Sequence, residues 1–297
     1  MKWEDLRSSS NVEDLRGSSN FARGSGGRGS LRFIIPLVRF LLGSKLGRKV
    51  LGVGAVVGVV AYFMGFNPLA LLNTADALTH PQPTQRVSKN DDKEARFVSA
   101  VLAQTEDVWK KIFKKHGLRY KEPKLVLFRG GVNSGCGYAS SQTGPFYCSA
   151  DEKVYLDLGF FDELSRNYNA SGDFAQAYVI AHEIGHHVQH LLGTLDKSHR
   201  AKRSASKKKA NAIQVKIELQ ADCYAGVWAH YLGNILENGD IDEALNAASA
   251  IGDDTLQKRA QGYVVPDSFT HGSSKSRMKW FKNGYMGGTL NSCRTGI

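Results

Sequence analysis

Apolar and polar residues follow different patterns along the chain, and these patterns divide it into four parts. Residues 1–49 are mostly polar or basic, whereas residues 50–72 form an apolar run without a charged side chain. Residues 73–92 are mostly polar again, and from residue 93 apolar positions recur at the spacings of helices and short strands. We therefore predict a tail, a membrane span, a linker and a folded domain that covers residues 93–297.

The folded domain is predicted to be α+β and rich in helices. Residues 93–116 place apolar side chains at helical spacing, which predicts one long amphipathic helix. The runs KLVLF (124–128) and KVYLDL (153–158) predict short strands of a small sheet. FAQAYVIAHEIGHHVQHLLG predicts a second helix that ends at Gly193, and most of the later sequence is also helical in pattern.

The run from 50 to 72 is long enough to cross a bilayer, which takes about twenty residues of helix. It is too long, and begins too far from the N-terminus, for a cleaved signal peptide. The preceding segment LRFIIPLVRFLLG (31–43) contains Arg32, Pro36 and Arg39, which favour a helix in the membrane interface over a second span. We therefore predict a single-pass protein.

Charge asymmetry predicts the orientation of this span. No lysine or arginine lies between residue 50 and Arg86, whereas ten precede the span, seven of them from residue 23 onward. The seven are Arg23, Arg28, Arg32, Arg39, Lys45, Arg48 and Lys49. Because positive charge stays in the cytoplasm, we expect a protein of the cell inner membrane with a cytoplasmic N-terminus and a periplasmic or extracellular domain.

The first thirty residues are predicted to be disordered, as part of a basic cytoplasmic tail. WEDLRSSSN (3–11) is followed by its near duplicate VEDLRGSSN (12–20), and then by the glycine- and serine-rich GSGGRGS (24–30). Such segments have little apolar surface to bury. The duplicate could instead be a docking motif for a partner, and the sequence leaves that alternative open.

The net charge of +11 raises the question of nucleic-acid binding. Much of the excess lies before the apolar segments and in KSHRAKRSASKKK (197–209), where no aromatic residue is interleaved. The chain has no helix-turn-helix, zinc-finger or RNP pattern. We therefore expect no nucleic-acid partner, and interpret these charges as solvated or facing lipid.

All four cysteines follow the predicted span, which places them in an oxidising compartment. Four cysteines allow three pairings. Cys136 and Cys148 flank a glycine- and proline-containing loop that can close on itself, so we favour this pair and assign Cys223–Cys293 by elimination. Metal binding is the competing interpretation, but the chain has no CxxC pair.

The motif HEIGH indicates a metal site on the second helix. His182 and His186 are four residues apart, so both imidazoles project from one face and can bind zinc together. Glu183 is rotated away from this pair and can act as the general base. KIELQADCYAGVWAH (216–230) supplies Glu218 as the candidate third ligand, and Asp222 could orient a ligand histidine.

Five blocks of sequence together resemble one protein family: HEIGHHVQHLLG, KIELQADCYAGVWAH, IGDDTLQKRAQG, VVPDSFTHGSSKSR and CGYASSQTGPFYCSADEKVYLDLGFFD. They resemble the bacterial putative neutral zinc metallopeptidases, which are membrane-anchored, zincin-like proteins. The resemblance runs in order from KWEDLRSSSNVEDLRG to the C-terminus. It implies a zincin-like domain in which His182, Glu183 and His186 have their motif roles and Glu218 is the third ligand. It implies no particular substrate.

His271, in SFTHGSSKSR, is a candidate for a second catalytic role. Peptidases of the zincin type use a donor beyond the metal to stabilise the oxyanion. A histidine followed by a residue such as Arg277 resembles the arrangement in other membrane-linked zincins. A histidine that caps a helix is the alternative, and the sequence favours neither.

These features predict a membrane-tethered, zinc-dependent endopeptidase with one zinc ion per chain. Glu183 would deprotonate a water activated by the metal, and that water would attack a peptide carbonyl. We expect KVYLDL (153–158) to be the edge strand that pairs with an extended peptide or protein substrate. The alternatives are a non-proteolytic zinc-binding scaffold of the envelope, which would not need Glu183, and a zinc hydrolase of another amide.

Overall fold

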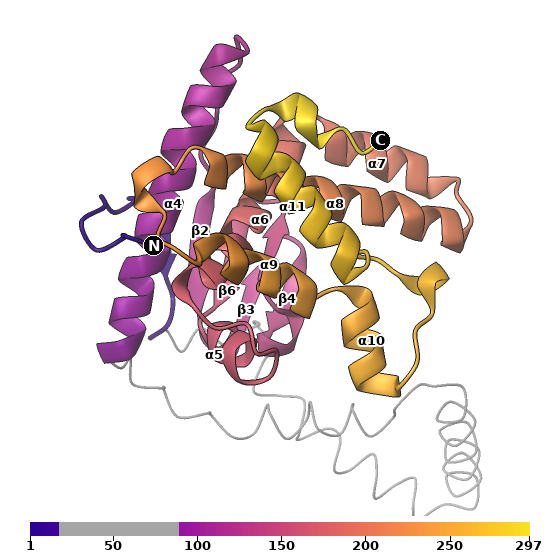
Figure 1. Ribbon diagram of the computed structural model, residues 1–297, viewed down its shortest axis with the longest axis horizontal. Coiled ribbons are helices and arrows are strands. Elements are labelled where there is room, and N and C mark those ends of the chain that lie inside the picture. Colours follow the sequence, from indigo (N-terminus) through magenta and orange to yellow (C-terminus); the bar gives the residue numbers. More distant parts are fainter. Residues whose placement is uncertain (18–88) are drawn as a thin grey trace, which may run out of the picture. The chain divides into compact units, whose positions relative to one another are not determined.

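The computed structural model describes residues 1–17 and 89–297, and most of these residues are helical (Figure 1). The α-helices are α4 (Lys89–Lys115), α5 (Gly159–Arg166), α6 (Asp173–Leu191), α7 (Thr194–Arg203), α8 (Lys207–His230), α9 (Asp240–Ala250), α10 (Asp253–Gln261) and α11 (Ser274–Gly287). The strands are β1 (Val12–Asp14), β2 (Lys124–Phe128), β3 (Gly131–Ser134), β4 (Gly137–Ser140), β5 (Phe146–Cys148) and β6 (Lys153–Asp157). The helix-rich α+β class predicted from the sequence is confirmed.

Both faces of the four-stranded sheet are buried. The strand order is β1-β2-β6-β5, in which β1, β2 and β6 are parallel and β5 is antiparallel to β6. Leu125 and Leu127 of β2 belong to the main core with the helices, whereas Val126 and Phe128 pack with the β3–β4 hairpin on the other face. Alternate residues of one short apolar strand therefore serve two cores.

The prediction that KVYLDL (153–158) is an edge strand is wrong. β6 lies between β2 and β5, and the outer strand on that side is β5. The run KVYLD has consecutive buried residues, as expected for a strand covered on both faces and paired on both sides. β5 contacts α6, so the free edge of the sheet on this side lies beside the helix that contains HEIGH.

Close helix packing holds the centre of the domain together. α8 packs against α6 and, most extensively, against α11. At the α8–α11 crossing a Cβ atom on Gly284 would lie 1.9 Å from the carbonyl oxygen of Cys223. Any side chain at Gly284 would therefore force the two helices apart. This close approach lets Arg277, near the start of α11, bond to Asp222 of α8 and Tyr178 of α6.

Residues 1–17 are ordered, so the predicted disorder of the tail is wrong for this segment. Trp3 is 7% exposed and packs edge-on against Phe97 of α4, and β1 extends the sheet by pairing with β2. Arg7 bonds to Glu106 and Asp107 of α4. The sequence pattern missed this segment because only a few of its residues are apolar and its polar groups are paired with distant ones.

The predicted topology also needs correction. Residues 1–17 and 89–297 belong to one folded unit, so they must lie in the same compartment. A membrane cannot separate the N-terminus from the domain, as the single-pass prediction required. The predicted span at 50–72, the interfacial helix at 31–43 and the linker as far as residue 88 lie outside the described residues. Within the described ranges, no helix is long and apolar enough to cross a membrane.

Both expected disulfides are present. Cys136–Cys148 closes the loop that contains β4 and β5, and Cys223–Cys293 ties α8 to the C-terminal segment. No described cysteine is free. Disulfides point to an oxidising location, periplasmic or extracellular. Because residues 1–17 belong to the same folded unit, they are expected there as well.

Replacement of Trp3 by alanine should lower the free energy of unfolding by about 3–5 kcal/mol, because it leaves a cavity against Phe97 in the main core. The exposed neighbour Lys2 is the matched control, and Lys2→Ala should change stability by less than about 0.5 kcal/mol. Denaturant titration of the purified full chain measures both values. Equal stability of Trp3→Ala and wild type would contradict the packing described for residues 1–17.

The shared compartment can be tested with single cysteines introduced at exposed positions. Ser10→Cys in the N-terminal segment and Lys111→Cys in α4 should react equally with a membrane-impermeant maleimide in intact cells. The native cysteines are paired and do not compete for the reagent. Labelling of one position in intact cells and of the other only after lysis would restore the single-pass topology.

Candidate metal centre

Helices α6 and α8 bring together the three predicted metal ligands. The Oε2 atom of Glu218 lies 3.2 Å from Nε2 of His182 and 3.4 Å from Nε2 of His186. A tetrahedral zinc ion with bonds of about 2.0–2.1 Å keeps its ligand atoms about 3.3 Å apart. These two separations therefore fit one zinc ion, and all three groups are largely buried.

Gly185 sets the distance between the two helices that supply these ligands. A Cβ atom at this position would lie 2.9 Å from the carbonyl oxygen of Ala221, one turn along α8 from Glu218. A larger residue would push α8 away from α6. The glycine of the HEIGH motif therefore brings the third ligand within reach of the two histidines.

A buried polar group holds the first histidine in place. Asp222 is fully buried, and its Oδ1 atom accepts a hydrogen bond of 2.8 Å from Nδ1–H of His182. The same carboxylate accepts bonds from Tyr178 and from two nitrogens of Arg277. Asp222 thus has the orienting position predicted for it, and Nε2 of His182 is left free to bind a metal.

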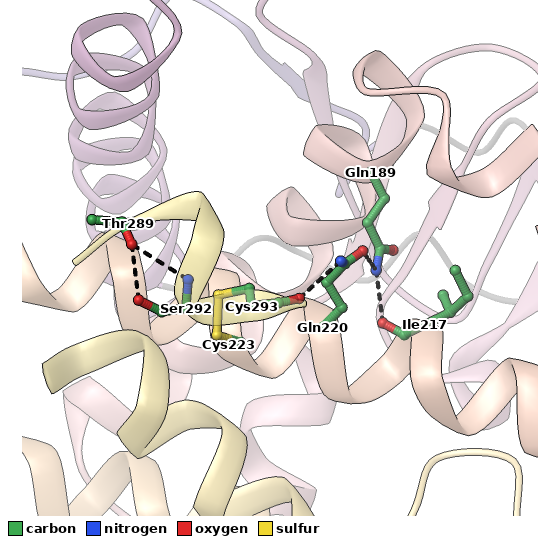
Figure 2. The surroundings of a disulfide bond; sticks show 7 residues. All are labelled: Gln189, Ile217, Gln220, Cys223, Thr289, Ser292 and Cys293. Atoms are coloured by element: carbon green, nitrogen blue, oxygen red, sulfur yellow. Dashed lines mark hydrogen bonds between the residues drawn. A yellow bond between two sulfur atoms is a disulfide. The ribbon is translucent and has the colours of Figure 1, made fainter. Parts of the chain in front are cut away.

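The second histidine has a different support, which the sequence analysis missed. Nδ1–H of His186 donates to Oε1 of Gln189 at 2.9 Å. Gln189 donates in turn to the carbonyl oxygen of Ile217 and to Gln220, which donates to the carbonyl oxygen of Cys293 (Figure 2). The i, i+3 spacing of His186 and Gln189 is a local signal that could have identified this pair.

The electrostatics of the ligand group favour a bound cation. Burial alone would raise the pKa of Glu218, but the neighbouring His186 and His182 outweigh it and hold this pKa well below its usual range. Burial lowers the pKa of His182, yet Asp222 and Glu218 raise it to about 10. Two carboxylates therefore stabilise positive charge here. Arg277 balances Asp222, and a zinc ion would balance Glu218.

Glu183 lies beside the ligand group and outside it. Its side chain is buried at the edge of the cleft, which Tyr147 of β5 also lines. Burial raises the pKa of Glu183, which makes its carboxylate a stronger proton acceptor. The structure therefore separates this carboxylate from the three ligands, as the motif predicts.

A cleft of about 500 Å³ opens onto these residues. The loop from Ser141 to Ser149 lines one side, and α7 lines another through Leu195, His199 and Lys202. Leu256 of α10 and the predicted catalytic residue His271 also line it. The cleft is thus bordered by α7 and by the α10 region.

His271 does not cap a helix, because the N-cap of α11 is Ser273. Its backbone N–H and its Nδ1 atom both contact Asp253, at 2.6 and 3.2 Å. Arg277, which the sequence pairs with His271, is instead buried and bonded to Asp222.

His187, which follows His186 in the sequence, is also separate from the metal group. Tyr147 and the carbonyl oxygen of Lys121 hold His187 in the core, and burial lowers its pKa to about 4.

A second acidic group in the described residues contains Asp173, Asp240 and Glu243. The N-terminal amino group of Met1 lies 2.7 Å from Asp173 and 3.2 Å from Asp240. This ammonium group already supplies a positive charge to the acidic cluster. The group of His182, His186 and Glu218 therefore remains the candidate metal centre.

Comparisons with known proteins agree with this centre. A family model described as "Putative neutral zinc metallopeptidase" matches residues 1–296. The chain is 46% identical to "Uncharacterized protein YpfJ" of Escherichia coli, over 99% of this chain and 98% of that protein. It is 42% identical to "Uncharacterized protein Mb2605" of Mycobacterium bovis, over 67% of this chain and 71% of that protein. No solved structure matches. Because the family match spans nearly every residue, the chain belongs to the putative neutral zinc metallopeptidase family.

Proposed function

We propose that this protein is a zinc-dependent peptidase with one zinc ion per chain, held by His182, His186 and Glu218. The observation that carries the proposal is the spacing of the three ligand atoms, with Glu183 beside them on an open cleft. Zinc at this position would supply a Lewis acid that polarises a carbonyl group and acidifies water. A purely structural zinc site would not need a buried glutamate at the cleft.

The residues of the chain divide the remaining work. Glu183 accepts a proton from the attacking water and delivers it to the amine that leaves when the peptide bond breaks. We assign the hydrogen bond to the oxyanion to His271, and its position in the lining of the cleft and its contact with Asp253 support this role. Asp222 and Gln189 each bond to Nδ1 of one ligand histidine and so fix the orientation of its ring.

An extended substrate would pair with β5. This strand is the outer strand of the sheet beside α6, and its Tyr147 lines the cleft together with Glu183. Strand addition at a sheet edge supplies main-chain hydrogen bonds to an extended peptide. We further propose a zincin-like arrangement of this domain and attachment to the membrane through residues 50–72.

Replacement of Glu183 by glutamine should keep zinc near one ion per chain and lower peptidase activity by about 100-fold or more, because an amide cannot accept the proton. Replacement of Glu218 by alanine should lose both zinc and activity. Metal analysis and digestion of a peptide library by the purified full chain measure both properties. Wild-type turnover by Glu183→Gln would exclude Glu183 as the base, and cleavage of non-peptide amides alone would identify a different hydrolase.

Loss of the acceptor on Gln189 should weaken zinc binding by about 10–100-fold, because Nδ1–H of His186 loses its partner. Gln189→Met keeps a similar volume and tests this directly. Gln220→Met is the matched control, since it removes the next link and leaves the bond to His186. Chelator competition measures the affinity of each variant. Equal affinities of the two variants would show that Gln189 does not act through His186.

A further inference from the structure

The end of α7, the start of α8 and the short turn between them are strongly basic, and we call residues 197–209 the basic turn. Residues 197–209 contain seven lysines and arginines and no carboxylate. Lys208 forms an ion pair with Asp267, and Lys202 and Lys197 bond to Gln214 and to the carbonyl oxygen of Ile297. The other four cations have no carboxylate partner among the described residues: Arg200, Arg203, Lys207 and Lys209.

An exposed apolar loop follows α10. Tyr263 is 62% exposed, and Val264 and Val265 are 38% and 39% exposed. The loop is held in place, because Gln257 accepts a hydrogen bond from the N–H of Val265 and donates one to Ser268. Three neighbouring apolar side chains are therefore presented to solvent from a backbone that is tied to α10.

The basic turn and the apolar loop form one surface. Asp267, which follows the loop, pairs with Lys208 at 2.8 Å, and its carbonyl oxygen accepts a bond from Asn211 of α8. Figure 1 shows the α7–α8 turn and the segment after α10 on the same side of the domain. The helices next to them also line the cleft, α7 through Lys202 and α10 through Leu256. We call the four cations and residues 263–265 the basic–apolar face.

We propose that the basic–apolar face binds the surface of an anionic lipid bilayer. Unpaired lysines and arginines are attracted to acidic headgroups, and aromatic and aliphatic side chains beside them can enter the interface. Each cation near such a surface strengthens binding roughly fivefold. The uncharged run at residues 50–72 of the same chain favours a bilayer over an acidic protein as the occupant.

Lipid binding at this face would also restrict the substrates, an inference that rests on the proposed peptidase function. Because the neighbouring helices α7 and α10 line the cleft, lipid contact at the face would hold the cleft close to the bilayer. The substrates would then be peptide segments close to the membrane surface. The lipid contact itself needs no catalysis, so it can be tested separately from peptidase activity.

The test places a tryptophan on the face and measures its contact with lipid. Full-length Tyr263→Trp is reconstituted into nanodiscs of phosphatidylglycerol and brominated phosphatidylcholine, and quenching beyond that of wild type is recorded. Met286→Trp is the matched control. Met286 is 78% exposed and lies near the C-terminal end of α11, where that helix packs against α8 at Val227. We expect strong quenching at position 263, little at position 286, and less at 263 when phosphatidylglycerol is omitted.

The second part of the test removes the positive charges of the basic–apolar face from the Tyr263→Trp protein. Replacement of Arg200, Arg203, Lys207 and Lys209 by glutamine should weaken binding of the face to the lipid surface on the order of several hundredfold. The quenching at position 263 should then be abolished. The same change at Lys111, Lys114, Lys115 and Arg119, at or just beyond the end of α4, should leave the quenching intact. Equal quenching at positions 263 and 286 would overturn the proposal. A response of Tyr263→Trp to soluble polyglutamate without lipid quenching would overturn it in favour of an acidic protein partner.

Discussion

The buried carboxylate of Asp222 is the group on which the centre of this domain depends. It is fully buried, and a charge in that position is costly unless several donors satisfy it. Tyr178 and His182 of α6 and Arg277 of α11 all donate to it. One carboxylate on α8 therefore fixes the relative positions of three helices. Loss of Arg277 would leave the charge of Asp222 uncompensated in the core, and loss of Asp222 would remove the bond that orients His182.

The two histidines of the candidate metal centre are supported by different chemistry, although one short motif contains both. Charged groups hold His182, whereas the neutral amides of Gln189 and Gln220 hold His186 and link it to the disulfide-bonded Cys293. Close packing of the helices at glycines brings both sets of supporting groups within hydrogen-bonding distance. The last segments of the chain thus complete a site whose motif lies near its middle.

Local patterns predicted the parts of the site that lie within one helix. The i, i+4 spacing identified His182 with His186, and the apolar flanks of Glu218 marked a buried carboxylate. The tyrosine and arginine partners of Asp222 were not predictable in this way, because they lie on elements far apart in sequence. Strand order is also a property of the whole fold, so the buried run KVYLDL was mistaken for an edge strand. The ordered N-terminus was missed because its few apolar side chains act through distant partners.

The ordered N-terminal segment also determines which edge of the sheet can receive a peptide. β1 covers the edge of β2, and its Glu13 pairs with Lys124 of β2 and Lys153 of β6. A three-residue strand with a charged side chain at its centre is a poor template for further pairing. On the other side, β5 ends the sheet next to Glu183 and has no such charge within Phe146–Cys148. The first residues of the chain therefore cover one edge of the sheet, and the outer strand on the other side is the one beside the candidate metal centre.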